Sequence, residues 1–341
     1  MDSEWRGGYI NANGVEVIAP QYASVEPFSE GLAAVTLRDR SHGYIDEQGR
    51  LVIGPNREWV SCGEFTEGCA VVRRNPRPNE RWNSSDLLSS SWLGPASYID
   101  RAGRYITERW FRNCAPFSEG LGCAGDSDHT TKYIDKTGTV VLTHPTWAGE
   151  FAEGLAAATQ QDSAGELRWG CIDRQGKWVI APREEYVPDP FSEGLMMVLH
   201  TVNGEQRVKF IDHQGRTVVS DYLWVGDRSS FSEGLAVVKT LRPNSRVVYI
   251  DHHGKIVIDL FGIGARRGRS FSEGIAAVDG PDGWGYISRN GKLVVPMVYD
   301  EGAGPFTGGL GFVMYTCNGH LMHGYVDRRG SLVYSFGRPK R

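Results

Sequence analysis

Two acidic residues recur along this sequence, and carboxylates serve in proteins as general acids, general bases and ligands for hard cations. One is the glutamate of a segment that reads F-x-E-G, and the other is the aspartate of a segment that reads Y-I-D-x-x-G. The glutamates are Glu30, Glu67, Glu119, Glu153, Glu193, Glu233 and Glu273, and the aspartates are Asp46, Asp100, Asp135, Asp173, Asp212, Asp251 and Asp327.

Repetition favours a structural role for both series. An active site is a single asymmetric arrangement of residues, whereas a residue that fixes a turn is expected in every unit of a repeat. A row of carboxylates that binds calcium is the alternative, but the repeat lacks the G-G-x-G-x-D pattern of calcium-binding β-rolls. We therefore assign both series to the fold.

The other candidates for chemistry are sparse. His252 and His253 stand at the two variable positions of a predicted turn, where metal binding would need ligands from elsewhere, so we predict a solvated turn. The stretch "GIGARRG" at 262–268 is a weak signal for an anion-binding loop. None of the six cysteines forms a C-x-x-C pair, and no G-x-S-x-G, H-E-x-x-H or Walker-type motif occurs. The sequence predicts no catalytic residue, no metal site and no cofactor.

The elements that carry these residues are predicted to be strands. The phenylalanine of F-x-E-G recurs about every 40 residues, a period that indicates a repeat architecture. Y-I-D suits a strand, D-x-x-G suits a hairpin turn whose glycine has a positive φ, and the following apolar run suits a return strand. We predict that this strand ends at its proline (Pro20, Pro55, Pro182 or Pro296). The repeated phenylalanines, expected to be buried anchors, are Phe28, Phe65, Phe117, Phe151, Phe191, Phe231, Phe271 and Phe306.

These motifs resemble those of the WG-repeat family, also called KWG repeats, from about Tyr9 to Tyr334. Y-I-D-x-x-G and F-x-E-G-L-A-x-V match often, but Trp-Gly itself occurs only at Trp169-Gly170 and Trp284-Gly285. Its absence elsewhere suits a packing role for the tryptophan. The resemblance implies a bacterial β-repeat architecture far more than it implies an activity.

We predict an all-β fold with little helix, formed by eight to nine units in a single repeat domain over residues 1–341. Each unit shows three clear strands and a short fourth after the proline. Because the chain begins and ends with complete hairpins, we favour an open, curved, solenoid-like array, with a closed β-propeller-like ring as the alternative.

Composition argues against several classes of function. Hydrophobic residues make up 40% and charged residues 23%, the net charge is −4, and no apolar run approaches the length of a membrane helix. We therefore predict a protein that binds neither nucleic acid nor membrane, and the start of the chain favours the cytoplasm. Arg266, Arg267 and Arg269 form a basic cluster, and residues 336–341 form a basic tail, both assigned to solubility.

The insertion at residues 73–97 is the most distinctive stretch outside the repeat. It lengthens the step from Phe65 to Phe117 and is rich in arginine, proline, asparagine and serine. Long loops are usually functional or disordered, and arginine and tryptophan are enriched at binding hot spots. The residues predicted to bind a partner are Arg74, Arg77, Arg81, Trp82 and Trp92. A mobile surface loop without function is the alternative.

The predicted function is that of a non-enzymatic scaffold that binds another protein. A specific version is a bacterial inhibitor or immunity-type protein that occupies a toxin's active site. The alternative function is a carbohydrate or cell-wall ligand-binding module, because aromatic-rich β-repeats can stack sugars. The sequence does not determine an oligomeric state.

Overall fold

A computed structural model describes residues 6–77, 80, 94–126, 128–184, 189–226 and 230–337. By internal contacts the chain divides into two compact units. The first comprises residues 1–9 and 16–183, and the second comprises residues 10–15 and 184–341. Strands dominate both units, and the prediction of little helix is confirmed for the described residues, whose one helix is the 3-10 turn η1 (Leu260–Ile263).

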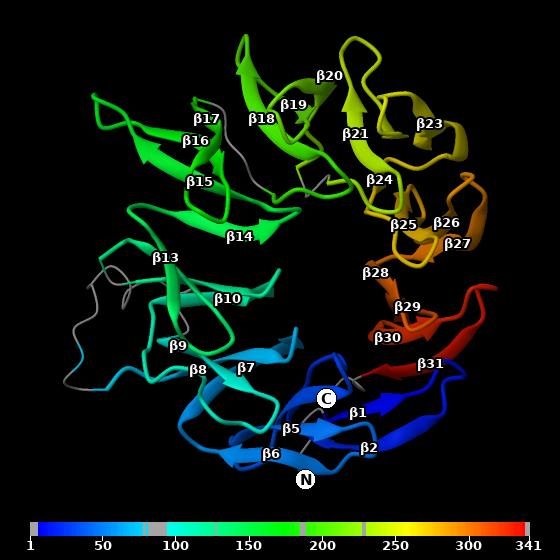
Figure 1. Cartoon of the computed structure of the whole chain (residues 1–341). Helices are drawn as coiled ribbons and strands as arrows, with labels where there is room; N and C mark the ends of the chain where they lie inside the picture. The colour runs from blue at the N-terminus through cyan, green and yellow to red at the C-terminus, as the bar shows by residue number, and fades with distance from the viewer. Residues whose placement is uncertain are drawn as a thin grey trace. The chain divides into compact units, whose positions relative to one another are not determined.

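The strands follow one another along the chain as shown in Figure 1. They are β1 (Gly7–Ile10), β2 (Glu16–Tyr22), β3 (Ser24–Val25), β4 (Leu32–Thr36), β5 (His42–Asp46), β6 (Leu51–Asn56), β7 (Trp59–Thr66), β8 (Cys69–Arg74), β9 (Ala96–Asp100), β10 (Asn113–Ser118), β11 (Leu121–Gly125), β12 (Thr131–Ile134), β13 (Val140–His144), β14 (Ala148–Ala152), β15 (Leu155–Gln161), β16 (Leu167–Ile172) and β17 (Trp178–Arg183). They continue with β18 (Met196–Val202), β19 (Glu205–Ile211), β20 (Thr217–Leu223), β21 (Ala236–Thr240), β22 (Val247–Ile250), β23 (Ile256–Asp259), β24 (Arg267–Gly268), β25 (Ile275–Gly280), β26 (Gly283–Ser288), β27 (Leu293–Tyr299), β28 (Gly302–Thr307), β29 (Leu310–Cys317), β30 (His320–Val326) and β31 (Leu332–Gly337).

Over the described ranges these strands form seven sheets of three to six strands and one two-stranded hairpin, β1–β2. A typical sheet holds four antiparallel strands in chain order, such as β14-β15-β16-β17 or β24-β25-β26-β27. The six-stranded sheet contains two repeats, joined where Tyr222 pairs with Thr240 and Leu223 pairs with Lys239. Four antiparallel strands per repeat are typical of a β-propeller blade.

The prediction of an open solenoid-like array is wrong. In an open array the first hairpin would contact only the repeat that follows it. Instead its turn, residues 10–15, belongs to the second compact unit. A Cβ on Gly14 would lie 2.3 Å from the carbonyl oxygen of Val333 in β31. The fold is therefore a β-propeller, which was the alternative, because the first hairpin lies against the last repeat of the chain.

The return strand continues through its proline, which corrects a second expectation. Pro55, Pro182 and Pro296 lie inside β6, β17 and β27, and each of these is the outer edge strand of its sheet. An edge strand tolerates proline because the missing N–H would face solvent. The pairing register shifts at each proline, as between Trp169 and Cys171 opposite β17, which identifies a β-bulge.

Each bulge requires a glycine on the neighbouring strand. A Cβ on Gly43, Gly170 or Gly285 would lie 2.5, 2.4 or 2.5 Å from the carbonyl oxygen of Ile53, Ile180 or Val295. Such a distance is shorter than side chains tolerate, so the glycine of Trp-Gly is needed wherever the outer strand carries the proline bulge.

Candidate functional site

The repeated glutamates join each repeat to the next one. In each F-x-E-G segment both the glutamate and the glycine have positive φ, 51° and 76° for Glu30 and Gly31. Ser29 and Leu32 exchange backbone hydrogen bonds across them, which makes the segment a two-residue hairpin turn. The Glu30 carboxylate accepts a hydrogen bond of 3.0 Å from the backbone N–H of Gly68, in the equivalent turn of the next repeat.

The same contact recurs along both units. The Glu67 and Glu193 carboxylates accept from the N–H groups of Gly120 and Gly234 at 2.7 and 2.9 Å. Further copies are Glu119 with Gly154, Glu233 with Gly274, and Glu273 with Gly308 and Gly309. The assignment of this series to the fold is supported, although these glutamates tie two turns together rather than closing one.

A cation from the following repeat completes several of these joints. Arg101 lies 3.3 Å from Glu30, Arg174 lies 3.1 Å from Glu119, and Arg328 lies 3.1 Å from Glu273. At one joint the basic residue is His252, whose Nε2 is 3.0 Å from Glu193 and whose ring stacks on Phe231 with 4.4 Å between centroids. His252 therefore lies in the predicted turn, where His253 is exposed, and its ring also takes part in a contact between repeats.

The tyrosine of Y-I-D makes a second kind of joint. The Tyr98 hydroxyl donates to the carbonyls of Ala115 and Cys123 at 2.8 and 3.0 Å, both in the next repeat. Its ring packs edge-on against Phe117 at 5.0 Å. Equivalent contacts are made by Tyr44, Tyr133, Tyr249 and Tyr286. Apart from Phe28, the repeated phenylalanines are buried, as predicted.

The repeated aspartates close the Y-I-D-x-x-G turns as predicted. Asp46 Oδ1 accepts from the N–H groups of Gln48 and Arg50 at 3.0 and 2.9 Å, and Gly49 has a φ of 76°. Burial by itself raises the pKa of Asp46, but the amide and guanidinium of Arg50 outweigh it and hold the pKa below its usual value. Since the repeated polar groups are occupied in this way, a functional site has to use residues outside the repeat pattern.

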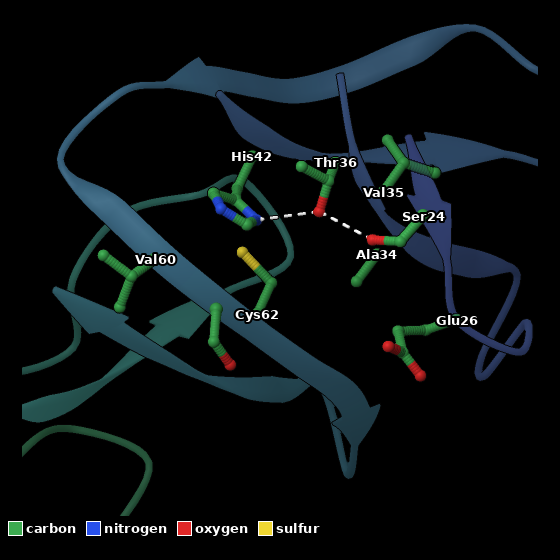
Figure 2. A pocket seen from close by; sticks show the side chains of 9 residues that line it. Ser24, Glu26, Ala34, Val35, Thr36, His42, Val60 and Cys62 are labelled. Carbon is green, nitrogen blue, oxygen red and sulfur yellow. Dashed lines mark hydrogen bonds between the residues drawn. The ribbon is translucent and has the colours of Figure 1, made fainter. Parts of the chain in front are cut away.

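The position before the glycine of the Trp-Gly motif is one such place. In the first full repeat His42 holds it, and a hollow of about 140 Å³ lies beside it (Figure 2). Ser24 Oγ donates to Thr36 Oγ1 at 2.8 Å, and Thr36 Oγ1 is 3.2 Å from His42 Nδ1. Cys62 points toward the imidazole from the far wall of the same hollow.

The electrostatics of this hollow do not activate a nucleophile. Burial raises the pKa of the Cys62 thiol to about 12, and a hydrogen bond with Tyr44 only partly opposes it. Burial also lowers the pKa of His42. A catalytic cysteine needs a depressed pKa and a base oriented by a third group. Instead, Thr36 lies between Ser24 and His42, so these side chains do not form a nucleophile paired with an oriented base.

The insertion has a firmly held base. The Arg74 side chain is 3% exposed, forms a two-pronged ion pair with the Glu80 carboxylate, and lies 4.2 Å from the ring centroid of Trp110. The Arg74 N–H donates to the carbonyl of Pro95 at 3.0 Å, which brings the two ends of the insertion together. Buried charges are retained in proteins when they are paired in this way.

The predicted partner-binding residues do not share one role. Arg74 is enclosed, whereas the Arg77 side chain is 62% exposed and lies 3.4 Å from Glu58. Arg81, Trp82 and Trp92 lie outside the described residues, as does most of the segment 73–97, so their role stays a prediction. The same holds for residues 338–341 of the basic tail.

Sequence reasoning missed the aromatic cluster beneath the insertion. Trp59 Nε1 donates to the Tyr105 hydroxyl at 2.8 Å, and the Tyr105 ring lies 5.5 Å from Trp110. Tyr105 is 42% exposed, so the cluster reaches the surface. Little in the sequence signalled it, because Tyr105 stands in the repeated apolar run after D-x-x-G and Trp59 stands six residues before Phe65, where the first repeat has Tyr22.

Among the residues that the structure describes, no group of three or more histidine, cysteine or acidic side chains is placed to hold a metal ion. No helix in the same residues is long and apolar enough to cross a membrane.

Comparison with known proteins identifies the repeat and the fold. The family model described as WG containing repeat matches residues 8–40, 43–75, 169–199 and 284–315. No curated protein matches the chain. A crystal structure described as that of the eukaryotic initiation factor has a TM-score of 0.67 at 10% identity, covering 98% of this chain and 95% of that one. At that identity the likeness shows the fold alone.

Two further solved structures are less similar. The computationally designed Ika8 protein has a TM-score of 0.48 at 13% identity, with 96% of this chain and 97% of that chain covered. BamB from Moraxella catarrhalis has a TM-score of 0.41 at 12% identity, with 90% and 92% covered. At TM-scores below 0.5 neither likeness supports a conclusion about this chain.

Proposed function

We propose that this chain, which contains WG repeats on a β-propeller fold, is a non-enzymatic scaffold that binds another protein. The observation that carries the proposal is the fixed base of the insertion. Arg74, Glu80 and Trp110 hold the start of the loop on a rigid sheet. Repeat proteins often place insertions of this kind on their binding face, and loops held by a rigid scaffold commonly carry binding residues.

The proposed binding surface comprises the insertion together with Arg77 and Tyr105. Arg77 reaches solvent and pairs only loosely with Glu58, so its guanidinium can exchange that partner for a carboxylate of the bound protein. Tyr105 offers a partly exposed ring held by Trp59 and Trp110. Rigid aromatic side chains and arginine are the residue types that dominate binding energy at interfaces.

The test is capture of a partner by the purified, tagged chain and by a variant whose residues 81–93 are replaced with a glycine-serine linker. This variant keeps Arg74, Arg77 and Glu80, so the buried ion pair survives and the fold should be retained. Replacement of the exposed turn at residues 162–165 is the matched control. The proposal expects a stoichiometric protein partner that only the loop variant loses; retention by the loop variant would contradict the assignment of the site.

The more specific version, an inhibitor or immunity-type protein that works in the cytoplasm, rests on sequence reasoning alone. It expects that the captured partner is an enzyme and that the intact chain inhibits it at equal concentration. If the loop replacement leaves inhibition unchanged, the chain inhibits the enzyme through a surface other than the insertion.

A second candidate function, carbohydrate binding, is favoured by one observation. Trp147 is 48% exposed and its ring lies 5.1 Å from Trp169, which leaves an aromatic surface open to solvent. Aromatic faces of this kind can stack on a sugar. Retention of the chain on polysaccharide resin, lost in Trp147→Ala and kept in the loop variant, would favour this function over protein binding.

A further inference from the structure

The segment between β23 and β25 presents an exposed apolar side chain from a fixed turn. Phe261, in the 3-10 turn η1, is 76% exposed, the largest exposure among the large hydrophobic residues of the described chain. Its N–H donates to the Asp259 carboxylate at 3.1 Å, and the Ala265 N–H closes the turn on the carbonyl of Leu260 at 2.9 Å. The exposure of Phe261 is therefore a feature of an ordered turn.

Two arginines next to this turn share one tryptophan. Arg267 and Arg269 are two residues apart, and their guanidinium carbons lie 5.3 and 5.1 Å from the ring centroid of Trp284. Arg267 also forms a close ion pair with Asp279, with Nε and Nη2 at 2.8 and 2.7 Å from the carboxylate. Trp284 and Asp279 are paired across β25 and β26, so the sheet holds both guanidinium groups in place.

The turn and the arginines lie close together. A Cβ on Gly268 would lie 3.0 Å from Leu260 Cδ1, next to Phe261, and the Arg266 N–H donates to the Asp279 carbonyl at 2.7 Å. Arg266 and Arg269 are exposed, and their side chains make no ion pair with a carboxylate of the described residues. Asp282, in the β25–β26 turn, is exposed, whereas the Asp279 side chain is only 13% exposed; the three arginines therefore outnumber the two acidic residues of this hairpin.

We propose that the surface formed by Phe261, Arg266, Arg269 and Trp284 docks an acidic segment of a partner protein in which carboxylates flank an apolar residue. Guanidinium groups pair well with carboxylates, and Phe261 supplies the apolar contact. A nucleic acid is the alternative polyanion. Its phosphates would extend beyond this patch and be repelled by the rest of the chain, whose net charge is −4, whereas a short acidic segment would contact the patch alone. The inference rests on the proposed scaffold function but uses a surface separate from the insertion.

The experiment measures binding of a short fluorescein-labelled peptide of aspartate and glutamate with a central leucine, using the full chain at low salt. A matched peptide with asparagine and glutamine in place of the acids is the probe control. We expect saturable binding of the acidic peptide alone, weakened by added salt because charge pairing supplies much of the attraction.

Variants locate the site. Arg266→Glu, together with Arg269→Glu, should weaken the peptide roughly ten-fold or more by reversing two charges. Arg266→Glu alone preserves the fold, since its exposed side chain makes no ion pair in the described chain, and should give a smaller loss. Phe261→Ala should weaken binding several-fold at unchanged melting temperature. Lys255→Glu, at the other end of β23, is the matched control and should bind like the parent chain.

Several results would overturn the inference. One is that Lys255→Glu weakens peptide binding as much as the arginine variants do. Another is that the neutral peptide binds with the same affinity as the acidic one. A third is that a single-stranded oligonucleotide displaces the peptide and binds more tightly than it. Failure here is distinguishable from failure of the proposed function, because partner capture is tested with the loop replacement. A chain that captures its partner through the insertion and ignores the acidic peptide would refute only this surface.

Discussion

The two Trp-Gly repeats share a backbone arrangement and differ in what surrounds the tryptophan. In both, the glycine lies against a proline bulge of the outer strand, opposite Ile180 in one repeat and Val295 in the other. Trp169 contacts the exposed ring of Trp147, whereas Trp284 lies beneath Arg267 and Arg269. The same local fold therefore supports an aromatic surface in one unit and a cationic surface in the other.

This difference shows which positions of the repeat can change without disturbing the contacts between repeats. The joints between repeats use the tyrosine, phenylalanine, serine and glutamate of the motifs, and each of these has a partner in the adjacent repeat, as Ser29 has in the carbonyl of Phe65. The side chain before the glycine of Trp-Gly makes no contact that recurs from repeat to repeat. It faces residues outside the motif, so its surroundings can change without loss of the fold.

The largest expected effect tests the shared backbone. Gly170→Ala and Gly285→Ala should each cost about 2–3 kcal/mol of unfolding free energy, because a methyl group would overlap a carbonyl oxygen that the bulge holds in place. Urea unfolding measures this cost. Gly262→Ala is the control, since that position is open and should stay within about 0.5 kcal/mol of the parent. Tolerance of alanine in only one repeat would show that the two bulges are not equivalent.

A smaller effect concerns the residue that follows the glycine. Tyr286 donates to the carbonyls of Gly304 and Phe312 at 3.0 and 2.7 Å, whereas the Trp169 repeat has Cys171 at this position. Tyr286→Phe should cost about 1–2 kcal/mol by leaving buried acceptors unpaired. Urea unfolding again measures the change. An unaltered midpoint would mean that the hydroxyl joint is dispensable in both repeats.

A pH-dependent effect is expected at the joint that leaves the Trp284 repeat. Burial raises the pKa of Glu273, but the amides of Gly308 and Gly309 and the Arg328 guanidinium outweigh it, so the pKa lies below its usual 4.5. A lowered pKa stabilises the fold above pH 4.5, and this stability is lost as the pH falls through the folded-state pKa. Glu273→Gln should therefore reduce the loss of melting temperature between pH 7 and pH 3. Glu166→Gln, at an exposed turn, should leave that loss unchanged.

The smallest effect compares two joints whose carboxylates face different basic residues. Glu193 faces His252, whereas the equivalent Glu273 faces Arg328. Arginine stays charged at every accessible pH, and its planar fork of donors matches a carboxylate. His252→Arg should therefore raise the free energy of unfolding at pH 8 by a few tenths of a kcal/mol, measured by urea unfolding. A gain that persists at high salt would assign the effect to packing on Phe231 instead of charge.

Much of the local structure was predictable from the residues. The D-x-x-G turns, the buried phenylalanines and the positive φ of the repeated glycines follow from side-chain chemistry that acts within a few positions. The hydrogen-bond partners of Glu30 and Tyr98 could not be predicted, because these contacts join residues in different repeats. The role of Arg74 in partner binding stays a prediction, and its burial against Trp110 could not be predicted because it depends on packing between segments distant in the sequence.

The sequence by itself determined that this protein consists of repeated antiparallel hairpins, because turn chemistry and strand alternation are properties of short segments. Only the tertiary structure decided between an open array and a propeller. That choice depends on whether the turn at residues 10–15 packs against β31. Contacts between the two ends of a chain leave no periodic trace in a sequence, since each end alone resembles any other hairpin of the repeat.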